Sequence, residues 1–297
     1  MRIGIDVGGT KIEGIAIDPA GTERVRQRVA TPGEYRATIQ AIRELVTDIE
    51  RNIDARASIG VGIPGTVSPA TGLVKNANST HLIGHPLDRD LEAALGRPVR
   101  VANDANCLAL SEATDGAAAG ARVVFGVIIG TGTGGGVVVD GTVLDGPNGI
   151  AGEWGHNPLP WPRDDERPGP DCYCGKSACV ETFLSGPGLA RDHEARSDER
   201  LSAATIAERA AAGDAAAEAT LERYVDRMAR ALAIVMNVVD PDVIVLGGGV
   251  SNIASLYQTL PALWSRYVFT DIVRTRLCRA KHGDSSGVRG AAWLWPK

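Results

Sequence analysis

The chain has 297 residues, 44% of them hydrophobic and 23% charged, so it has ample apolar material for a folded core and intrinsic disorder is excluded as its main state. Its 31 basic and 36 acidic residues give a formal net charge of −5, which lacks the basic excess that nonspecific nucleic-acid binding requires. Glycine is abundant, at 36 residues, so turns in which a Cβ would obstruct a ligand are the first features to examine.

The first ten residues, MRIGIDVGGT, contain no apolar signal-peptide core, and no later apolar run approaches the roughly 18 residues that a membrane-spanning helix needs. We therefore expect a cytoplasmic protein with no membrane partner. Five cysteines in such a chain favour metal binding or burial over a disulfide framework.

The first third of the chain reads as alternating strands and helices. Two short β-type runs are joined by Gly8, Gly9 and Thr10, which predicts a hairpin rather than a strand followed by a helix. Apolar residues that recur three, four and seven residues apart predict an amphipathic helix over 35–53. The other predicted elements are the hairpin strands 2–7 and 12–17, buried strands 58–63 and 99–102, and a helix over 105–115.

The pattern of strand, Gly/Thr turn and strand recurs at 123–129 and 136–139, and this self-similarity suggests that each of two lobes is built around a related sheet. We place the lobe boundary near residue 117. The predicted N-terminal α/β lobe covers 1–117 and is joined by a C-terminal helix within 285–297, and the C-terminal α/β lobe covers 118–284. The later predicted elements are helices 204–212, 215–239, 253–267 and 288–295 and a strand at 243–246.

Three glycine-rich turns are candidates for holding phosphate, because backbone N–H groups must approach phosphate oxygens closely. GIDVGGTK does not match the P-loop pattern, and Gly130, Gly132 and Gly135 precede a strand rather than the helix that a dinucleotide fold requires. The turn at 247–249 does precede a helix. Each turn by itself is equally well explained by a need for positive φ, but the three together, with Asp6 available to a hydrated Mg²⁺, indicate an ATP-dependent phosphotransferase.

Six segments in order resemble the ROK sugar kinases: DVGGTK at 6–11, NDANC at 103–107, GTGTGGG at 130–136, EWGH at 153–156, CYCGKSACVE at 172–181 and VLGGG at 245–249. KNANSTHLIGHPL at 75–87 and KHGDSSGVRGAAWLW at 281–295 are most similar to bacterial fructokinases of the mannofructokinase type. The resemblance covers essentially the whole chain.

This resemblance implies a two-lobed actin-like, ribonuclease H-like α/β ATPase fold with ATP and Mg²⁺ in an interlobe cleft, and a homodimer. It implies transfer of the γ-phosphoryl group of ATP to the 6-hydroxyl of fructose and also of mannose. A glucokinase or an N-acetylhexosamine kinase is the alternative within the family. The residues implied in nucleotide binding are Asp6, Gly8, Gly9, Thr10, Lys11, Thr131, Gly132, Thr133, Gly134, Gly247, Gly248 and Gly249.

Phosphoryl transfer needs an acceptor hydroxyl held in line with the γ-phosphate and a group that takes its proton. Asp104 is the predicted catalytic base, which orients the hydroxyl and accepts its proton late in the reaction. The alternative is that Asn103 and Asp104 only cap the helix that begins near residue 105.

Sugar recognition uses carboxylate, amide and imidazole groups that the wrong epimer would leave unpaired. Glu153 and His156 are three residues apart, a spacing that lets both face one pocket on a helical turn but also suits a surface contact. A turn would explain Gly65 and Asn78 adequately. The sugar ligands that the resemblance implies are Gly65, Asn78, Asn103, Asp104, Glu153, His156 and Glu181.

Cys172, Cys174 and Cys179 follow His156 closely, and a Cys₃His set is a recognised structural zinc site. Free thiols are the alternative from spacing alone, and the resemblance implies zinc. Ala178 stands where the family usually has glycine, which puts the local backbone geometry in doubt. If one nitrogen of His156 binds zinc, the other can donate to a sugar hydroxyl, so the metal would aim the ring.

The rival from another functional class is a non-catalytic sugar-sensing regulator, since some ROK relatives are sugar-responsive repressors. The first predicted strand begins by residue 3, which leaves no room for an N-terminal helix-turn-helix, and the acidic net charge also argues against a nucleic-acid partner. We therefore expect hexose and ATP as the partners of this chain.

Overall fold

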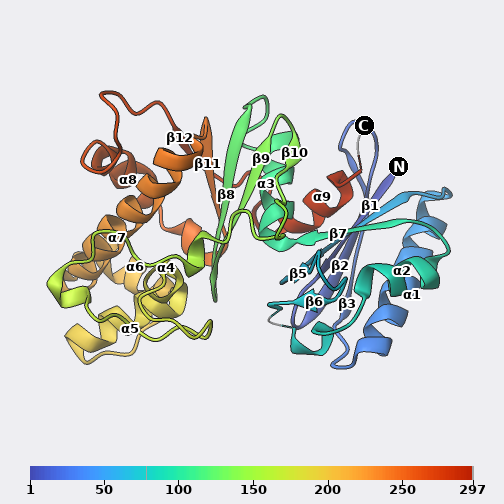
Figure 1. The fold of residues 1–297 in the computed structure, drawn as a ribbon, viewed down its shortest axis with the longest axis horizontal. Helices are drawn as coiled ribbons and strands as arrows, with labels where there is room; N and C mark the ends of the chain where they lie inside the picture. The colour runs from blue at the N-terminus through green and yellow to red at the C-terminus, as the bar shows by residue number, and fades with distance from the viewer. Residues whose placement is uncertain (78, 296–297) are drawn as a thin grey trace. The chain divides into compact units, whose positions relative to one another are not determined.

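The computed structural model describes residues 1–77 and 79–295, and within this part the chain divides into two compact units. The first unit is Met1–Gly120, Gly136–Ala151 and Asp284–Lys297, and the second is Ala121–Gly135 and Gly152–Gly283. Figure 1 shows the course of the chain through both units. The sequence analysis assigned 136–151 to the second lobe, whereas this segment is part of the first unit.

The first unit is built on a five-stranded mixed sheet in the order β3-β2-β1-β4-β7. The pairs β1/β2 and β2/β3 are antiparallel, and β1/β4 and β4/β7 are parallel. The strands are β1 (Arg2–Val7), β2 (Lys11–Ile17), β3 (Glu23–Ala30), β4 (Ser58–Ile63) and β7 (Val99–Asn103). The antiparallel β1/β2 hairpin confirms the prediction from its glycine turn, and β3 lacks the apolar alternation that would have predicted it.

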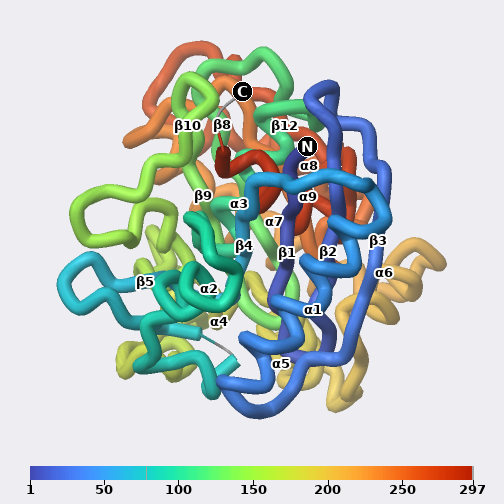
Figure 2. Tube along the Cα trace, turned by 90° about the vertical axis from the view of Figure 1, so that its right-hand side faces the viewer, coloured from blue at the N-terminus to red at the C-terminus, as the bar shows by residue number. Residues whose placement is uncertain are grey.

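Helices cover both faces of this sheet. Ile5 and Gly14 are register partners, and a Cβ on Gly14 would meet Ile49 and Leu45 of α1, so this face packs against α1. Gly4 points to the opposite face, where a Cβ would lie 2.0 Å from the carbonyl oxygen of Val288 in α9. Figures 1 and 2 show α1 and α9 beside these strands. The helices of this unit are α1 (Tyr35–Ile53), α2 (Leu87–Leu95), α3 (Asp104–Thr114) and α9 (Ser286–Trp293).

Short elements complete the first unit. The two-stranded sheet of β5 (Thr66–Val67) and β6 (Val74–Lys75) precedes a 3₁₀ turn, η1 (Thr80–Leu82), and another 3₁₀ turn, η5 (Gly283–Ser285), leads into α9. Elements of this length carry no periodicity and were not predicted.

The second five-stranded sheet has the order β10-β9-β8-β11-β12. The pairs β8/β11 and β11/β12 are parallel, and β9/β10 is antiparallel. The strands are β8 (Val123–Ile129), β9 (Thr133–Val139), β10 (Thr142–Val143), β11 (Val243–Gly247) and β12 (Arg276–Arg279). β9 begins at Thr133 rather than at the predicted residue 136, because its position in the sheet outweighs the low β-propensity of glycine.

The long helix of the second unit has the bounds that apolar periodicity predicts. α7 (Ala215–Val239) has the predicted bounds, and Asp214 caps its first turn. The predicted helix 253–267 is wrong in its bounds: a 3₁₀ turn, η4 (Gly249–Asn252), is followed by extended Ile253 before α8 (Leu256–Trp264). The remaining elements are η2 (Trp154–His156), η3 (Asp164–Glu166), α4 (Val180–Leu184), α5 (Gly186–Ser197) and α6 (Ala203–Ala211).

A buried ion-pair network ties the loop before the cysteine segment to α7. Oε1 of Glu166 accepts hydrogen bonds from Nε of Arg227 at 2.8 Å and from Nη2 of Arg230 at 2.6 Å. Arg230 also donates to the carbonyl oxygens of Pro160 and Trp161. Burial alone would raise the pKa of Glu166, but the two arginines lower it to about 2, so the carboxylate stays ionised. Among the described residues, no helix is long and apolar enough to cross a membrane.

Candidate active site

Asn103 and Asp104 lie at the junction of β7 and α3 in the first unit. Oδ1 of Asn103 accepts a hydrogen bond from the backbone N–H of Ala105 at 2.8 Å, so Asn103 is the N-cap of α3. Nδ2 of Asn103 donates to the carbonyl oxygen of Gly65 at 3.2 Å. Asp104 is the first residue of the helix, where the helix dipole favours a negative charge. The cap considered in the sequence analysis is therefore present: Asn103 is the N-cap residue, and the same N–H of Ala105 also donates to Oδ1 of Asp104 at 2.8 Å.

Asp6 in β1 is within electrostatic reach of Asp104. Burial first, then the negative charges of Asp104 and Glu13, raise the pKa of Asp6 from 3.8 to about 7, against an opposing effect of Lys11. A carboxylate suits a hydrated divalent cation, whose positive charge would offset the repulsion that Asp6 feels from its negative neighbours. Asp6 therefore fits the expected Mg²⁺ by the chemistry of its donor atoms.

The hairpin turn between β1 and β2 carries the first set of predicted nucleotide residues. The backbone N–H of Gly8 donates to the carbonyl oxygen of Lys11 at 2.9 Å, which closes the turn. Gly9 and Thr10 are exposed, and a Cβ on Gly9 would meet nothing within 4 Å. An open main-chain turn of this kind can be approached by phosphate oxygens. Nζ of Lys11 lies 3.7 Å from Oε2 of Glu13.

Gly65 follows β4 with a φ of 141°, a conformation that L-residues rarely adopt. A Cβ at this position would lie 2.8 Å from the carbonyl oxygen of Lys75 and 2.9 Å from Ala77, so the fold itself requires glycine here. Its carbonyl oxygen is the acceptor that holds Asn103. Asn78, the other predicted sugar ligand of this region, lies outside the described residues.

In the second unit, two of the predicted glycine loops lie side by side. Gly247 at the end of β11 is the register partner of Ile128 near the end of β8, so the loops at 130–134 and 247–249 leave adjacent parallel strands at the same edge. The carboxyl edge of parallel strands is the usual ligand-binding edge of α/β sheets. The N–H of Gly186, the first residue of α5, donates to the carbonyl oxygen of Gly130 at 2.8 Å.

The segment EWGH packs directly on the loop GTGTGGG. A Cβ on Gly155 would lie 2.0 Å from the carbonyl oxygen of Thr133, so only glycine allows this approach. Nε1 of Trp154 donates to the carbonyl oxygen of Gly134 at 3.0 Å, and its ring meets Phe125 edge to face. Two motifs that are separated in the sequence thus form one structural feature.

Glu181, in the first turn of α4, also reaches this loop. Its Oε2 accepts a hydrogen bond from the backbone N–H of Thr133 at 2.9 Å. Glu153 is exposed and directly precedes the 3₁₀ turn η2, which ends at His156. The spacing of three thus falls on one tight turn, as the sequence analysis proposed. Glu181 was predicted as a sugar ligand and Thr133 as a nucleotide residue, and the structure links the two.

His156, Cys172, Cys174 and Cys179 form a single cluster, in which the four donor atoms all lie within 4.8 Å of one another. Tetrahedral zinc, with bonds of about 2.3 Å to sulfur and about 2.0–2.1 Å to nitrogen, would separate two sulfurs by roughly 3.8 Å and nitrogen from sulfur by roughly 3.6 Å. Sγ of Cys174 and Sγ of Cys179 are 3.6 Å apart, and Nδ1 of His156 is 3.6 Å from Sγ of Cys172. The residues therefore fit a structural zinc ion.

Ala178, which precedes the last cysteine, has a φ of 56°. The left-handed backbone that suits glycine is retained although the residue is alanine. This conformation costs an L-residue roughly 1–2 kcal/mol. The departure from the family pattern thus introduces local strain and leaves the cysteine ligands in place.

Tyr173 is a residue of this region that the sequence analysis missed. Its hydroxyl oxygen lies 2.9 Å from Nε2 of His156, the nitrogen that was expected to meet the sugar. Desolvation by its neighbours, followed by the charges of Glu181, Cys172 and Glu153, raises the pKa of Tyr173 to about 12, so the phenol keeps its proton. The signal that could have found it is a large aromatic residue between two cysteine ligands.

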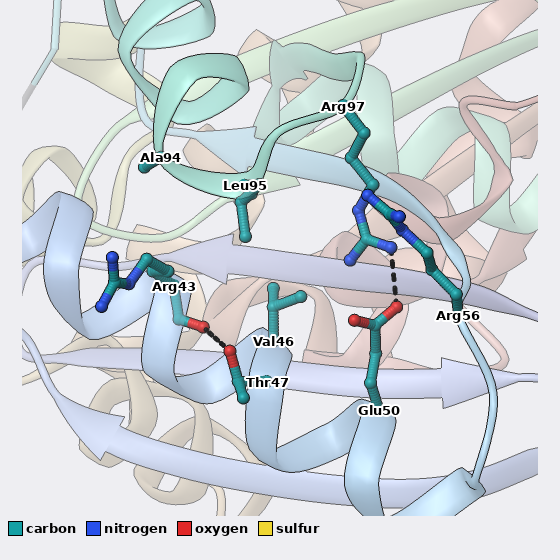
Figure 3. A pocket seen from close by; sticks show the side chains of 8 residues that line it. All are labelled: Arg43, Val46, Thr47, Glu50, Arg56, Ala94, Leu95 and Arg97. Atoms are coloured by element: carbon teal, nitrogen blue, oxygen red, sulfur yellow. Dashed lines mark hydrogen bonds and ion pairs between the residues drawn. The ribbon is translucent and has the colours of Figure 1, made fainter.

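A cavity of about 310 Å³ in the first unit lies between α1 and the end of α2 (Figure 3). Nη1 of Arg97 pairs with Oε1 of Glu50 at 2.7 Å, and Arg43 points away from this pair. None of the predicted site residues lines the cavity.

The chain matches the model of the ROK family over residues 2–297. It is 41% identical to the N-acetyl-D-glucosamine kinase of Pasteurella multocida, over 99% of each chain. Among solved structures, it is similar to the ROK hexokinase of Thermus thermophilus, with a TM-score of 0.88 and 33% identity over 99% of this chain and 97% of that one. It is also similar to a ROK family glucokinase from Streptomyces griseus solved with glucose and AMPPNP, with a TM-score of 0.78 and 29% identity over 99% and 98% of the two chains. The chain therefore belongs to the ROK family, as a sugar kinase with the two-lobed actin-like α/β fold.

Proposed function

We propose that this protein is an ATP-dependent hexose kinase that transfers the γ-phosphoryl group of ATP to a sugar hydroxyl, with N-acetyl-D-glucosamine as its first candidate substrate. The observation that carries this choice is the 41% identity, over 99% of both chains, to a kinase named for that sugar. The similar hexokinase and glucokinase support phosphorylation of a hexose.

Fructose is the second candidate substrate, together with mannose. The segments 75–87 and 281–295 resemble fructokinases, and they favour a reaction at the 6-hydroxyl of a ketohexose. The named relatives give no support to fructose. Pocket detail rather than fold decides between such substrates.

Asp104 is the proposed base in this mechanism. Its place at the start of α3 fixes the carboxylate on a rigid element, and the cap supplied by Asn103 holds the backbone there. Asp104 would accept a hydrogen bond from the acceptor hydroxyl, orient it, and take its proton as the bond to phosphorus forms. ATP supplies the phosphoryl group, and Mg²⁺, held through Asp6, would neutralise charge on its phosphates.

The glycine loops are the proposed phosphate contacts, through Gly8–Lys11, Thr131–Gly134 and Gly247–Gly249. The proposed sugar contacts besides Asp104 are Gly65, Asn78, Asn103, Glu153, His156 and Glu181. Zinc held by His156 and the three cysteines would fix the orientation of the imidazole and take no part in the transfer.

A coupled ADP-release assay with Mg·ATP tests the proposal. The acceptors are N-acetylglucosamine, N-acetylmannosamine, glucose, mannose and fructose, with the Asp104→Asn variant as the blank. The highest kcat/KM on N-acetylglucosamine, absent in the variant, supports the first candidate. A preference for fructose would select the second candidate, and no activity on any hexose would contradict the proposed function and favour a sugar-sensing regulator.

A further inference from the structure

The cavity of about 310 Å³ in the first unit has a basic lining (Figure 3). Arg43, Arg56 and Arg97 line it together with a single carboxylate, that of Glu50. The other lining residues carry no charge: Val46, Thr47, Ala94 and Leu95. Three guanidinium groups and one carboxylate leave two positive charges of the lining unbalanced, and a concave surface with one sign of charge attracts ligands of the opposite sign.

One face of α1 contributes to this lining. The lining residues of α1 recur every three or four positions, which places them on the same side of the helix: Arg43, Val46, Thr47 and Glu50. Arg56 lies just beyond the end of α1, and Arg97 follows Gly96, the left-handed C-cap of α2. The ends of two helices therefore bring the three arginines to one cavity.

Glu50 holds Arg97 in place. Oε1 of Glu50 accepts a hydrogen bond from the backbone N–H of Ala57 at 2.8 Å and another from Nη1 of Arg97 at 2.7 Å. The side chains of Arg97 and Glu50 are only 12% and 23% exposed, so salt screens this pair less than it screens a pair on the open surface. Arg97 therefore presents a fixed guanidinium group to the cavity.

The guanidinium groups of the cavity have donors that the described residues do not use. Nε of Arg97 is buried and has no acceptor among them, which is unfavourable unless a ligand supplies one. Arg56 donates from Nη2 to the carbonyl oxygen of Gly96 over a long distance of 3.5 Å. Figure 3 shows the guanidinium groups of Arg56 and Arg97 converging above Glu50. Their like charges repel, and an anion between them would remove this repulsion.

We propose that this cavity is a binding site for a phosphoryl group, either free phosphate or the phosphate of a small monoester, held by Arg56 and Arg97. A phosphate monoester carries a charge of about −1.5 to −2 at pH 7, which matches the two unbalanced charges of the lining. Planar guanidinium groups also match the geometry of phosphate oxygens. A carboxylate would balance only one of the two charges.

The size of the cavity limits the ligand. Pockets for small molecules span about 300–1,000 Å³, so a volume of about 310 Å³ suits a small phosphate compound. None of the residues proposed to bind ATP or sugar lines this cavity. The site therefore adds a second phosphate-binding function to the chain, and it does not depend on the proposed kinase activity.

Isothermal titration of the full chain with inorganic phosphate, at constant ionic strength and without ATP, tests the inference. We expect a Kd of about 1 mM or below, as two charge-assisted hydrogen bonds would give. Arg56→Gln should weaken this binding about 10-fold or more. Glu50→Gln should tighten it about 3-fold or more, because the one negative charge of the lining is removed. Arg51→Gln, at an exposed arginine of α1 outside the cavity, is the matched control and should leave the Kd unchanged.

Glucose 6-phosphate in place of phosphate distinguishes the two sources of the phosphoryl group. A tighter Kd that is equally sensitive to Arg56→Gln supports a monoester, and a Kd no tighter than that of phosphate supports free phosphate. Melting curves provide a second measurement, because a ligand that binds only the folded chain raises Tm. Phosphate should raise the Tm of the wild type more than that of Arg56→Gln, while the two proteins without phosphate should melt together.

Equal phosphate binding by the wild type and Arg56→Gln would overturn the inference, as would the absence of binding of either compound. The arginines would then serve only to offset the carbonyl ends of α1 and α2. If Glu50→Gln unfolds, Arg56→Gln still decides the question, since Arg56 is exposed. None of these measurements uses turnover, so their failure would leave the proposed kinase function untouched.

Discussion

Glu181 and Thr133 are joined by a hydrogen bond of 2.9 Å, from the backbone N–H of Thr133 to Oε2 of the carboxylate. Thr133 belongs to the glycine loop proposed to contact phosphate, and Glu181 is the second residue of α4, the helix that follows the last cysteine of the cluster. One carboxylate oxygen thus holds the loop, and Glu181 is also one of the residues proposed to bind sugar. In the proposed reaction, the phosphate loop and the sugar would share a single side chain.

Glu181→Gln should therefore impair both substrates. The amide keeps the size of the side chain but removes the charge, and a hydrogen bond to a charged group is worth about 1.5–3 kcal/mol. We expect the KM for sugar and the KM for ATP each to rise roughly 10-fold or more. Steady-state kinetics with each substrate varied in turn measures this, with Glu194→Gln, at an exposed residue of α5, as the control. A change confined to the KM for sugar would contradict the positioning of Thr133.

Asp104→Asn should abolish turnover, because the amide cannot take the proton of the acceptor hydroxyl. Sugar and ATP affinities should stay close to wild type, since the cap of α3 is made by Asn103. Isothermal titration measures the affinities and the coupled assay the rate. Asp48→Asn, at an exposed residue of α1, is the control that should retain full activity. Turnover above a few per cent of wild type would be incompatible with Asp104 as the base.

Removal of zinc should raise the KM for sugar and lower Tm, with a smaller effect on the KM for ATP. The reason is that His156 would lose the bond that aims its ring. Chelation followed by elemental analysis and melting curves tests this, and Cys179→Ser should reproduce it. Cys278→Ser, outside the cluster, should change neither value. A metal-free protein with an unchanged KM for sugar would remove the proposed link between metal and substrate.

Asp6 should make the ligand-free protein less stable as pH rises. Burial, and then Asp104 and Glu13, raise its pKa from 3.8 to about 7. Between these values only the folded chain holds the proton, so the free energy of unfolding falls as pH increases through this window. The difference in free energy of unfolding between Asp6→Asn and the wild type should therefore favour the variant more at pH 8 than at pH 5. Urea unfolding of both proteins at the two pH values measures the difference, and an equal effect at both would refute it.

Ala178→Gly should stabilise the protein. Alanine at a φ of 56° pays roughly 1–2 kcal/mol of strain, whereas glycine costs about 0.5–1 kcal/mol of additional chain entropy. The expected net gain in the free energy of unfolding is about 0.5–1 kcal/mol. Ala207→Gly within α6 should have the opposite sign, at about 1 kcal/mol of destabilisation. Destabilisation by Ala178→Gly in urea unfolding would show that the left-handed backbone is not strained.

The local sequence pattern was sufficient to predict the long secondary-structure elements and the motifs. The bounds of α1 and α7 follow from apolar residues at helical spacing, and the hairpin at Gly8–Lys11 follows from its turn. The four members of the candidate metal cluster could be named from residue type and spacing together with the family resemblance, since spacing alone left free thiols as the alternative. These features depend on residues that are close in the chain.

Other features depended on approaches between distant segments. Arg230 on α7 is buried because Glu166 and the carbonyl oxygens at 160–161 accept its hydrogen bonds. The apolar periodicity of the helix does not predict a buried arginine. The contact of Glu181 with Thr133 spans 48 residues, and that of Tyr173 with His156 spans 17. Sequence alone determined the fold class and the family, and it named the candidate site residues. Only the tertiary structure decided which polar atoms meet, because a hydrogen bond forms only where packing brings its donor and acceptor within about 3 Å.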